Sequence, residues 1–352
     1  MQFDATGGCC RKIKRLEQHQ SSHLFLYEGV LEIEKKTFTA LSMVSEQHDN
    51  LAISTWLDRW LRCGVRAPKM TVCDQSLALM SALVKSFIQF KSLEEYLGTC
   101  FKLVSNGSNE NILYCYIRND VNHFIHLICK WAPLTKSEYA RTKPLYVRSM
   151  ALLIFCNTLE EAKVILEAIF KIAFSKNDGL LVNPTEHITK TPCALSKIFL
   201  KNLIKDKSHI FKALTSLLIP VVLMTYLLQC DMHNDYNMSE TVGNSFQEWA
   251  FIIADNRKAA VDHVEGEDDN GQYMPELVPL IINFLKLYPC WSGVFKNENL
   301  PTMTSGRGGK GFVVTDTNHR LPNSLSFYAV MCGHMKRVQD PIHRWHQVLL
   351  VK

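Results

Sequence analysis

The first 130 residues alternate between short apolar segments and segments with helical periodicity, and this alternation constrains the fold more than any single motif. Residues 24–33 and 38–44 are rich in strand-forming side chains, are separated by a charged break, and predict a hairpin. Two further apolar segments, 70–73 and 112–117, are each followed by a helical pattern. With a short strand at the N-terminus, the expected order is strand, strand, strand, helix, strand, helix, strand, helix. This order predicts an α/β domain built on a mixed sheet.

Strand signals fade after residue 135, and the remainder of the chain predicts mostly helices. We expect a sheet domain at 1–135, a large α-helical insertion at 136–296, and a region at 297–352 that combines a glycine-rich loop with the C-terminal remainder of the core. A polar stretch, 265–272, separates the last two helical patterns. In all, four helical patterns are recognisable after residue 135, at residues 149–174, 194–204, 245–262 and 275–287.

Charge and cysteine spacing narrow the classes of protein to consider. The formal net charge is +5 and the pI about 8.5, which permits nucleic-acid binding without requiring it. The twelve cysteines include no C-x2-C pair, so a structural zinc module is not expected. No signal peptide begins at Met1, and the thiols are expected to be reduced in an intracellular protein of the nucleus or cytoplasm.

One apolar segment raises the question of a membrane. Residues 213–230 contain no charged side chain, and this length lies at the lower limit for a bilayer-spanning helix. Pro220 lies near the middle of the segment, which also contains Thr, Ser and Gln side chains. We expect a kinked helix buried in the helical region and no membrane partner; a single membrane span is the alternative.

Two aspartates follow apolar runs and are candidate metal ligands. Asp4 lies at the tip of what reads as a short first strand before a glycine turn, and Asp74 follows the apolar segment at 70–73. If the two strands are neighbours, both carboxylates could share a Mg²⁺ or Mn²⁺ ion, because these cations prefer oxygen ligands. The alternative is that each aspartate forms a turn or caps a helix.

A basic cluster follows Asp4 closely in the sequence. It consists of Arg11, Lys12, Lys14 and Arg15. Such a cluster could contact the phosphates of a nucleic acid, which would make DNA a partner. The alternative is a solvated basic loop.

Five short sequence segments, distributed over most of the chain, together resemble a known family. They are Phe-Asp-Ala-Thr-Gly-Gly at 3–8, Trp-Leu-Asp-Arg-Trp at 56–60, Val-Cys-Asp-Gln-Ser-Leu-Ala-Leu at 72–79, Ile-Arg-Asn-Asp-Val-Asn-His-Phe at 117–124 and Tyr-Pro-Cys-Trp-Ser at 288–292. In this order and spacing they resemble the catalytic region of Mutator-like DDE transposases. The resemblance implies a ribonuclease-H-like fold interrupted by a helical insertion, and a DNA-cleaving and DNA-joining activity that uses two divalent metal ions.

The resemblance also assigns roles to individual residues. It implies that Asp4 and Asp74 are the first and second metal-binding aspartates, and that Asp120 and His123 support the site. His123 could equally be a helix histidine without a catalytic role. In the family a glutamate completes the site, and the corresponding position here is Gly309.

The missing glutamate predicts impaired catalysis, because glycine supplies no metal ligand. Glu298 is the nearest substitute, although it precedes Pro301 in an expected loop. The leading hypothesis is a transposase-derived protein with weak nucleic-acid binding and impaired strand transfer. The alternative is a non-enzymatic helical interaction module that retains the fold.

Overall fold

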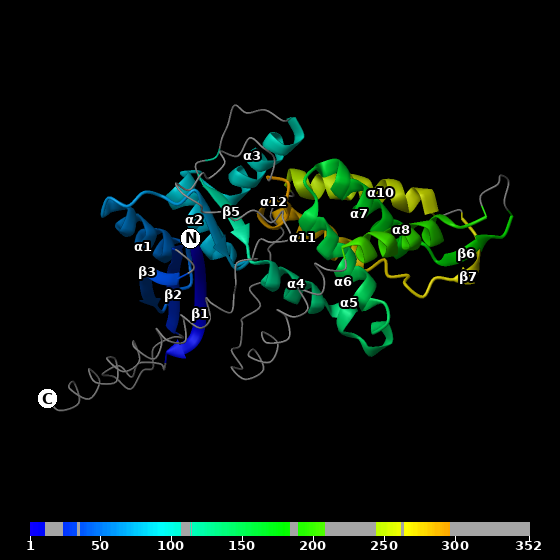
Figure 1. The fold of residues 1–352 in the computed structure, drawn as a ribbon, viewed down its shortest axis with the longest axis horizontal. Helices are drawn as coiled ribbons and strands as arrows, with labels where there is room; N and C mark the ends of the chain where they lie inside the picture. The colour runs from blue at the N-terminus through cyan, green and yellow to red at the C-terminus, as the bar shows by residue number, and fades with distance from the viewer. Residues whose placement is uncertain are drawn as a thin grey trace.

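The structure is a computed structural model, and it describes residues 1–10, 24–33, 36–106, 113, 115–183, 189–207, 244–261 and 264–295. A five-stranded sheet with the order β3-β2-β1-β4-β5 lies at one end, and most of the helices lie at the other (Figure 1). Strands β1, β2 and β3 are antiparallel, whereas β4 and β5 run parallel to β1. The strands are β1 (Gln2–Cys10), β2 (Leu24–Ile33), β3 (Lys36–Ser45), β4 (Met70–Cys73) and β5 (Tyr116–Asn119).

The sheet confirms the expected α/β class and the order of its elements, with two corrections. The first strand is not short: β1 has nine residues and continues through the predicted glycine turn. Its pairing with β2 becomes irregular between Gly7 and Cys10, and glycine is tolerated at such irregularities. The strand predicted at 112–117 lies later, at Tyr116–Asn119, where it pairs with all four residues of β4.

Helices follow the sheet strands where short polar side chains can cap them. Asp49 accepts a hydrogen bond from the Ala52 N–H at the start of α1 (Asn50–Arg62). Ser76 caps α2 (Leu77–Leu83), which continues into a π-helical turn at Val84–Ile88. Helices α3 (Leu93–Asn106) and α4 (Val121–Cys129) complete this part of the molecule.

One predicted helix of the helical part is divided in the structure. The helix predicted at 149–174 is two helices, because Thr158 starts a new one by accepting a hydrogen bond from the Glu161 N–H at 3.1 Å. The helices of this part are α5 (Ala132–Thr135), α6 (Lys143–Leu152), α7 (Leu159–Phe174), α8 (Pro192–Asp206), α10 (Ser245–Val261), α11 (Leu277–Phe284) and α12 (Tyr288–Trp291), with 3-10 turns at Ser137–Tyr139, Leu153–Phe155 and Leu285–Leu287.

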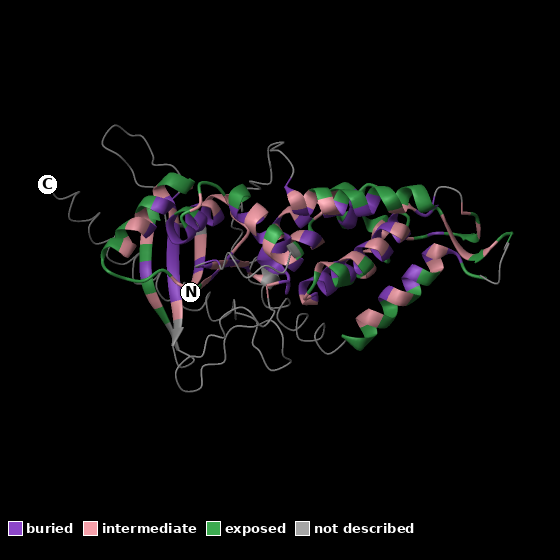
Figure 2. Cartoon of the chain, turned by 90° about the horizontal axis from the view of Figure 1, so that it is seen from above, coloured by how far each residue is buried: buried purple, intermediate pink, exposed green. Residues whose placement is uncertain are grey.

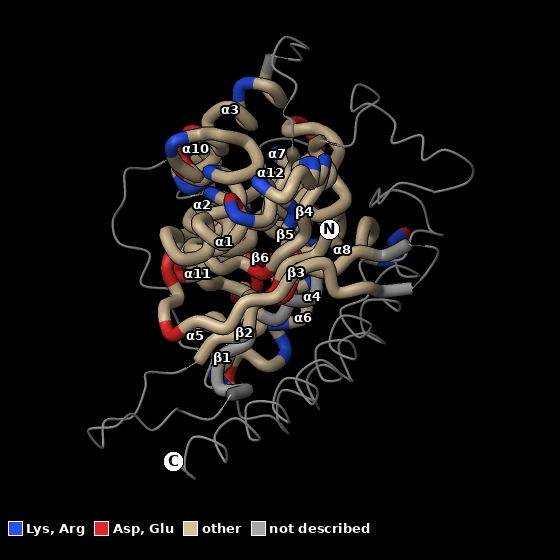
Figure 3. The backbone as a smooth tube through the Cα atoms, turned by 90° about the vertical axis from the view of Figure 1, so that its left-hand side faces the viewer, with Lys and Arg blue, Asp and Glu red and all other residues tan. Residues whose placement is uncertain are grey.

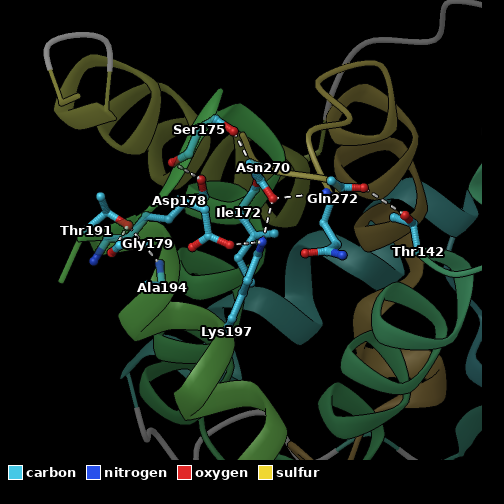
Figure 4. Close-up of polar contacts among 12 residues, drawn as sticks. Thr142, Ile172, Ser175, Asp178, Gly179, Thr191, Ala194, Lys197, Asn270 and Gln272 are labelled. Carbon is cyan, nitrogen blue, oxygen red and sulfur yellow. Dashed lines mark hydrogen bonds and ion pairs between the residues drawn. The ribbon is translucent and has the colours of Figure 1, made fainter. Parts of the chain in front are cut away.

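A second, two-stranded sheet lies in the part of the chain where the strand signals fade. Strands β6 (Asn177–Leu181) and β7 (Gly266–Asp269) pair antiparallel, and β7 lies inside the polar stretch that was expected to be a separator. Just after β7, Asn270 donates hydrogen bonds to the carbonyls of Ile172 and Ser175 at the end of α7 (Figure 4). The side chain of Lys197 donates to Asn270 Oδ1 at 2.6 Å and holds α8 in the same network.

The hydrophobic core is continuous from the sheet into the helical part. Figure 2 shows the buried residues running through the interior of both parts. Helix α12 joins them, since the Phe124 and Trp291 rings lie 4.3 Å apart and the Arg118 guanidinium donates to the Pro289 carbonyl at 3.0 Å. Two of the sequence segments that carried the family resemblance, 117–124 and 288–292, are therefore in direct contact.

Within the described part of the chain, no helix is long and apolar enough to cross a membrane. The apolar segment at 213–230, with its expected kink at Pro220, lies outside the described residues.

Candidate functional site

Asp4, on β1, lies level with Asp74, which directly follows the neighbouring strand β4. Gln2 of β1 is the register partner of Val72 of β4, and the two strands are parallel. Counting two residues onward along both strands brings Asp4 opposite Asp74. Neighbouring strands are about 4.8 Å apart, and residues in register point to the same face of a sheet. The backbone therefore places the two predicted ligands side by side.

Asp120 extends this arrangement across β5. Cys73 is the register partner of Asn119, so the next residues, Asp74 and Asp120, are also level. The Asp120 N–H donates to the Cys73 carbonyl at 2.8 Å, which continues the parallel ladder one residue beyond the strands. We call Asp4, Asp74 and Asp120 the aspartate row.

Burial along the three strands agrees with this common face. The residue before each aspartate is buried, whereas each aspartate is only half-buried. This alternation is the period of two that a strand imposes. The buried residues are Phe3, Cys73 and Asn119.

Glu28 is an acidic neighbour of the row that the sequence analysis missed. It is the antiparallel register partner of Asp4 on β2, and its side chain is fully buried. The Thr39 hydroxyl donates to Glu28 Oε2 at 3.1 Å. The sequence predicts the hairpin that contains Glu28, but it does not give the register of that hairpin against the first strand. Without the register, Glu28 cannot be placed beside Asp4.

The two carboxylates also affect a neighbouring thiol. Burial raises the pKa of Cys73 well above its usual value, and the negative charges of Asp74 and Asp4 raise it further. Both aspartates are therefore close enough to Cys73 for their charges to act on it. The Cys73 thiol is held in its neutral form, which makes it an unsuitable nucleophile.

Hydrogen bonds hold the Asp74 turn from two sides. The Ser76 N–H donates to Asp74 Oδ1 at 3.2 Å, and the amide of buried Asn119 donates to the Asp74 carbonyl at 3.0 Å. Asp4 Oδ1 accepts a hydrogen bond from the Ala5 N–H at 2.8 Å. The neighbouring backbone thus orients both carboxylates before any ligand binds.

His48 connects this turn to β2. One ring nitrogen, Nε2, lies 3.2 Å from the Ser76 hydroxyl, and the other, Nδ1, lies 2.7 Å from the Tyr27 hydroxyl. The imidazole is stacked on Phe25, with 4.7 Å between ring centroids. Burial, followed by the charges of Asp49 and Asp74, raises the pKa of Tyr27, so its hydroxyl stays protonated.

The residues that the structure describes contain no group of three or more His, Cys, Asp or Glu side chains able to hold a metal ion. The donor chemistry of Asp4 and Asp74 still fits Mg²⁺ or Mn²⁺, since one or two carboxylates with water satisfy these cations. For His123 the structure describes the backbone in α4 but not the side chain. The other predicted site residues, Glu298, Arg11, Lys12, Lys14 and Arg15, and the position Gly309, lie outside the described residues.

The chain is similar to a curated protein. Over 296 residues the chain is 25% identical to the "120.7 kDa protein in NOF-FB transposable element" of Drosophila melanogaster, and the match covers 84% of this chain. The chain is similar to a transposon-encoded protein. It spans about a quarter of that relative, since the match covers 26% of the relative's length. No family model matches the chain, and no solved structure matches it. The similarity supports a transposon-related origin.

Proposed function

We propose that this chain is the core of a transposon-derived protein with a ribonuclease-H-like fold, related to the Mutator-like DDE transposases. The observation that carries the proposal is the register of the parallel strands β1 and β4, which brings Asp4 of β1 level with Asp74, the residue directly after β4. The strand order, with three antiparallel strands followed by two parallel ones, supports the same fold. The similarity to a transposon-encoded protein supports the origin.

In this proposal Asp4 and Asp74 hold a divalent cation, with Asp120 beside them in the aspartate row. A bound Mg²⁺ or Mn²⁺ would supply Lewis-acid polarisation of a phosphate oxygen of DNA. The Ser76 N–H bonds the Asp74 carboxylate and the Asn119 amide bonds the Asp74 carbonyl, so both the side chain and the backbone of Asp74 are held. The chain's contribution is thus to position oxygen ligands side by side, on the central strand β1 and at the carboxyl ends of β4 and β5.

The proposed activity is impaired, because Gly309 stands where the family resemblance implies a third carboxylate. Two carboxylates and water give a partial site, which predicts weak cation binding and little DNA cleavage or joining. DNA remains the proposed partner. Along the described backbone, Lys and Arg are interspersed with Asp and Glu (Figure 3). The basic cluster Arg11, Lys12, Lys14 and Arg15 carries four positive charges within five residues, and we propose that it contacts the DNA phosphates.

A Mn²⁺ titration tests this proposal. The wild type should bind Mn²⁺ weakly, and Asp4→Asn or Asp74→Asn should weaken binding at least tenfold, because each removes one anionic ligand. Asp255→Asn is the matched control, since Asp255 is an exposed carboxylate on α10. Equal binding heats for the wild type and Asp74→Asn in calorimetry would show that Asp74 is structural. Strong Asp74-dependent DNA cleavage with Mn²⁺ would contradict the impaired state.

Exposed apolar side chains favour a second candidate, a protein-interaction function of the helical part. Phe251 and Ile252 of α10 are each 59% exposed, and Leu195 and Ile198 of α8 are 49% and 40% exposed. Large apolar side chains exposed in groups often mark interaction surfaces. A helical partner function would persist in Asp4→Asn and Asp74→Asn, whereas a function of the aspartate row would not.

A further inference from the structure

Both ring nitrogens of His48 are engaged, although the residue lies in the loop between β3 and α1. A neutral imidazole offers one donor and one acceptor, and Tyr27 and Ser76 each carry a hydroxyl that can take either part. The Tyr27 hydroxyl has a second acceptor in the Gln47 carbonyl at 3.3 Å. Stacking on Phe25 fixes the plane of the ring. His48 is thus held as a rigid bridge between β2 and the turn after β4.

Ser76 links this bridge to Asp74. Its N–H donates to Asp74 Oδ1, while its hydroxyl lies at hydrogen-bonding distance from His48 Nε2 and accepts from the Leu79 N–H at 3.4 Å. The Ser76 backbone therefore contributes to the orientation of the Asp74 carboxylate. On the opposite side, Asn119 holds the Asp74 carbonyl, so rotation of the turn is opposed from both ends.

We propose that His48 is a positioning residue for Asp74: through Ser76 it sets the orientation of the turn so that the Asp74 carboxylate stays aligned with Asp4 for cation binding. The proposal rests on the proposed function of the aspartate row. Partners that orient a metal ligand commonly contribute tenfold or more to metal affinity, although they do not touch the metal. His48 should contribute in this way, through the turn.

Two substitutions separate the roles of the two ring nitrogens. The side-chain amide of Gln reaches about as far as Nε2 of histidine, whereas the amide of Asn reaches only about as far as Nδ1. His48→Gln can therefore still bond Ser76, and His48→Asn can bond Tyr27 but not Ser76. The two variants therefore differ in whether the side chain at position 48 can bond Ser76, while both keep a polar, uncharged side chain there.

The experiment measures the Mn²⁺ dissociation constant of the full chain from the electron paramagnetic resonance signal of free Mn²⁺. We expect His48→Asn to raise the constant about tenfold and His48→Gln to stay within about threefold of the wild type. Hydrogen exchange at the Ser76 and Leu79 amides should accelerate in His48→Asn only, because the turn loses its support. Urea unfolding midpoints should be alike in both variants.

The outcomes separate this inference from the proposed function. Wild-type Mn²⁺ affinity in His48→Asn, together with loss of binding in Asp74→Asn, would overturn the positioning role alone. Wild-type affinity in Asp74→Asn would overturn the proposed cation site and the positioning role with it. Equal weakening in His48→Gln and His48→Asn with lowered unfolding midpoints would show that His48 only stabilises the fold.

Discussion

Lys197 is a nearly fully buried cation, and its surroundings explain how the helical part tolerates it. Its ammonium forms an ion pair with Asp178 and a hydrogen bond with Asn270. Burial alone would raise the pKa of Asp178, but the hydrogen bonds from Lys197 and from the Gly179 N–H, with the charge of Lys197, lower it. The pair is therefore ionised in the folded protein. Asn270, which accepts a hydrogen bond from Lys197, also donates to the carbonyls of Ile172 and Ser175 at the end of α7.

The lowered pKa of Asp178 predicts a pH-dependent contribution to stability. Because the folded-state pKa lies below the unfolded value of about 3.9, the stabilisation is present above that pH and is lost as the pH falls through the folded pKa. Asp178→Asn should lower the free energy of unfolding by about 2 kcal/mol at pH 6, since Lys197 loses its counter-charge. The difference from the wild type should shrink as the pH falls below the unfolded value of about 3.9 and toward the folded pKa.

Urea unfolding at pH 6 and at about pH 3 measures this difference. Asp255→Asn is the control, because Asp255 is exposed and should change the free energy of unfolding by less than about 0.5 kcal/mol at either pH. A destabilisation by Asp178→Asn that is the same at both pH values would show that the ion pair contributes nothing.

Residue-level reasoning could find Asp4 and Asp74, because a carboxylate that follows a short apolar segment is recognisable in a sequence, although β1 continues past Asp4 in the structure. It could not find Glu28 or His48. Glu28 reads as one more polar position of a hairpin, and only the register of β1 against β2 brings it beside Asp4. His48 reads as a loop residue, and its contact with Ser76 joins positions 28 residues apart.

At the scale of elements, α12 is four residues long and yet joins the sheet to the helices. Trp291 is fully buried, and its ring packs against Phe124, Phe284 and Tyr288. Among the described residues, its indole Nε1 has no hydrogen-bond partner. The stabilisation by Trp291 is therefore expected to come from packing alone.

Trp291→Phe and Trp291→Ala test this expectation. Phe keeps an aromatic ring and loses no hydrogen bond, so the free energy of unfolding should fall by only about 1–2 kcal/mol. Ala leaves a large cavity, so it should fall by about 3–5 kcal/mol. Denaturant unfolding followed by circular dichroism measures both. Nearly equal losses for the two variants would show that a hydrogen bond of the indole matters after all.

The elements that the sequence predicted poorly lack the signals that such predictions use. β6 and β7 are built from Asn-Asp-Gly-Leu-Leu and Gly-Glu-Asp-Asp, and Asp, Asn and Gly are depleted in strands. Tertiary pairing overrides local preference there. The start of α7 could have been predicted, because Thr158 followed by Glu161 is a capping signal. The apolar periodicity continues on both sides of Thr158, however, and it favours one uninterrupted helix.

For the whole molecule, the proposed interaction with DNA is electrostatic. Changing Arg11, Lys12, Lys14 and Arg15 to alanine takes the net charge from +5 to +1 by removing four positive charges. If these side chains bind phosphates, the slope of log affinity against log salt concentration should fall by up to about 0.9 for each phosphate that is no longer neutralised. A salt titration of binding to duplexes of two unrelated sequences measures the slope.

The control variant removes the same charge from the helical part. Lys201, Lys205, Lys207 and Lys258 are exposed, so changing them to alanine should leave the salt slope at its wild-type value. Equal slopes for all three proteins would place the basic face elsewhere. Absence of binding at low salt in the wild type would favour the protein-interaction function of the helical part.

The hydrogen bond between Arg118 and Pro289 joins positions 171 residues apart. At about 5–20 residues per second, a ribosome needs roughly 10–35 s to synthesise the intervening chain. During that interval β5 can pair with β4, but α12, which packs against β5 and α4 in the finished protein, does not yet exist. The nascent sheet and α4 therefore leave the ribosome with apolar side chains uncovered, among them Phe124 of α4. A chaperone that binds apolar segments should engage this chain early in its synthesis and release it only after Trp291 has emerged.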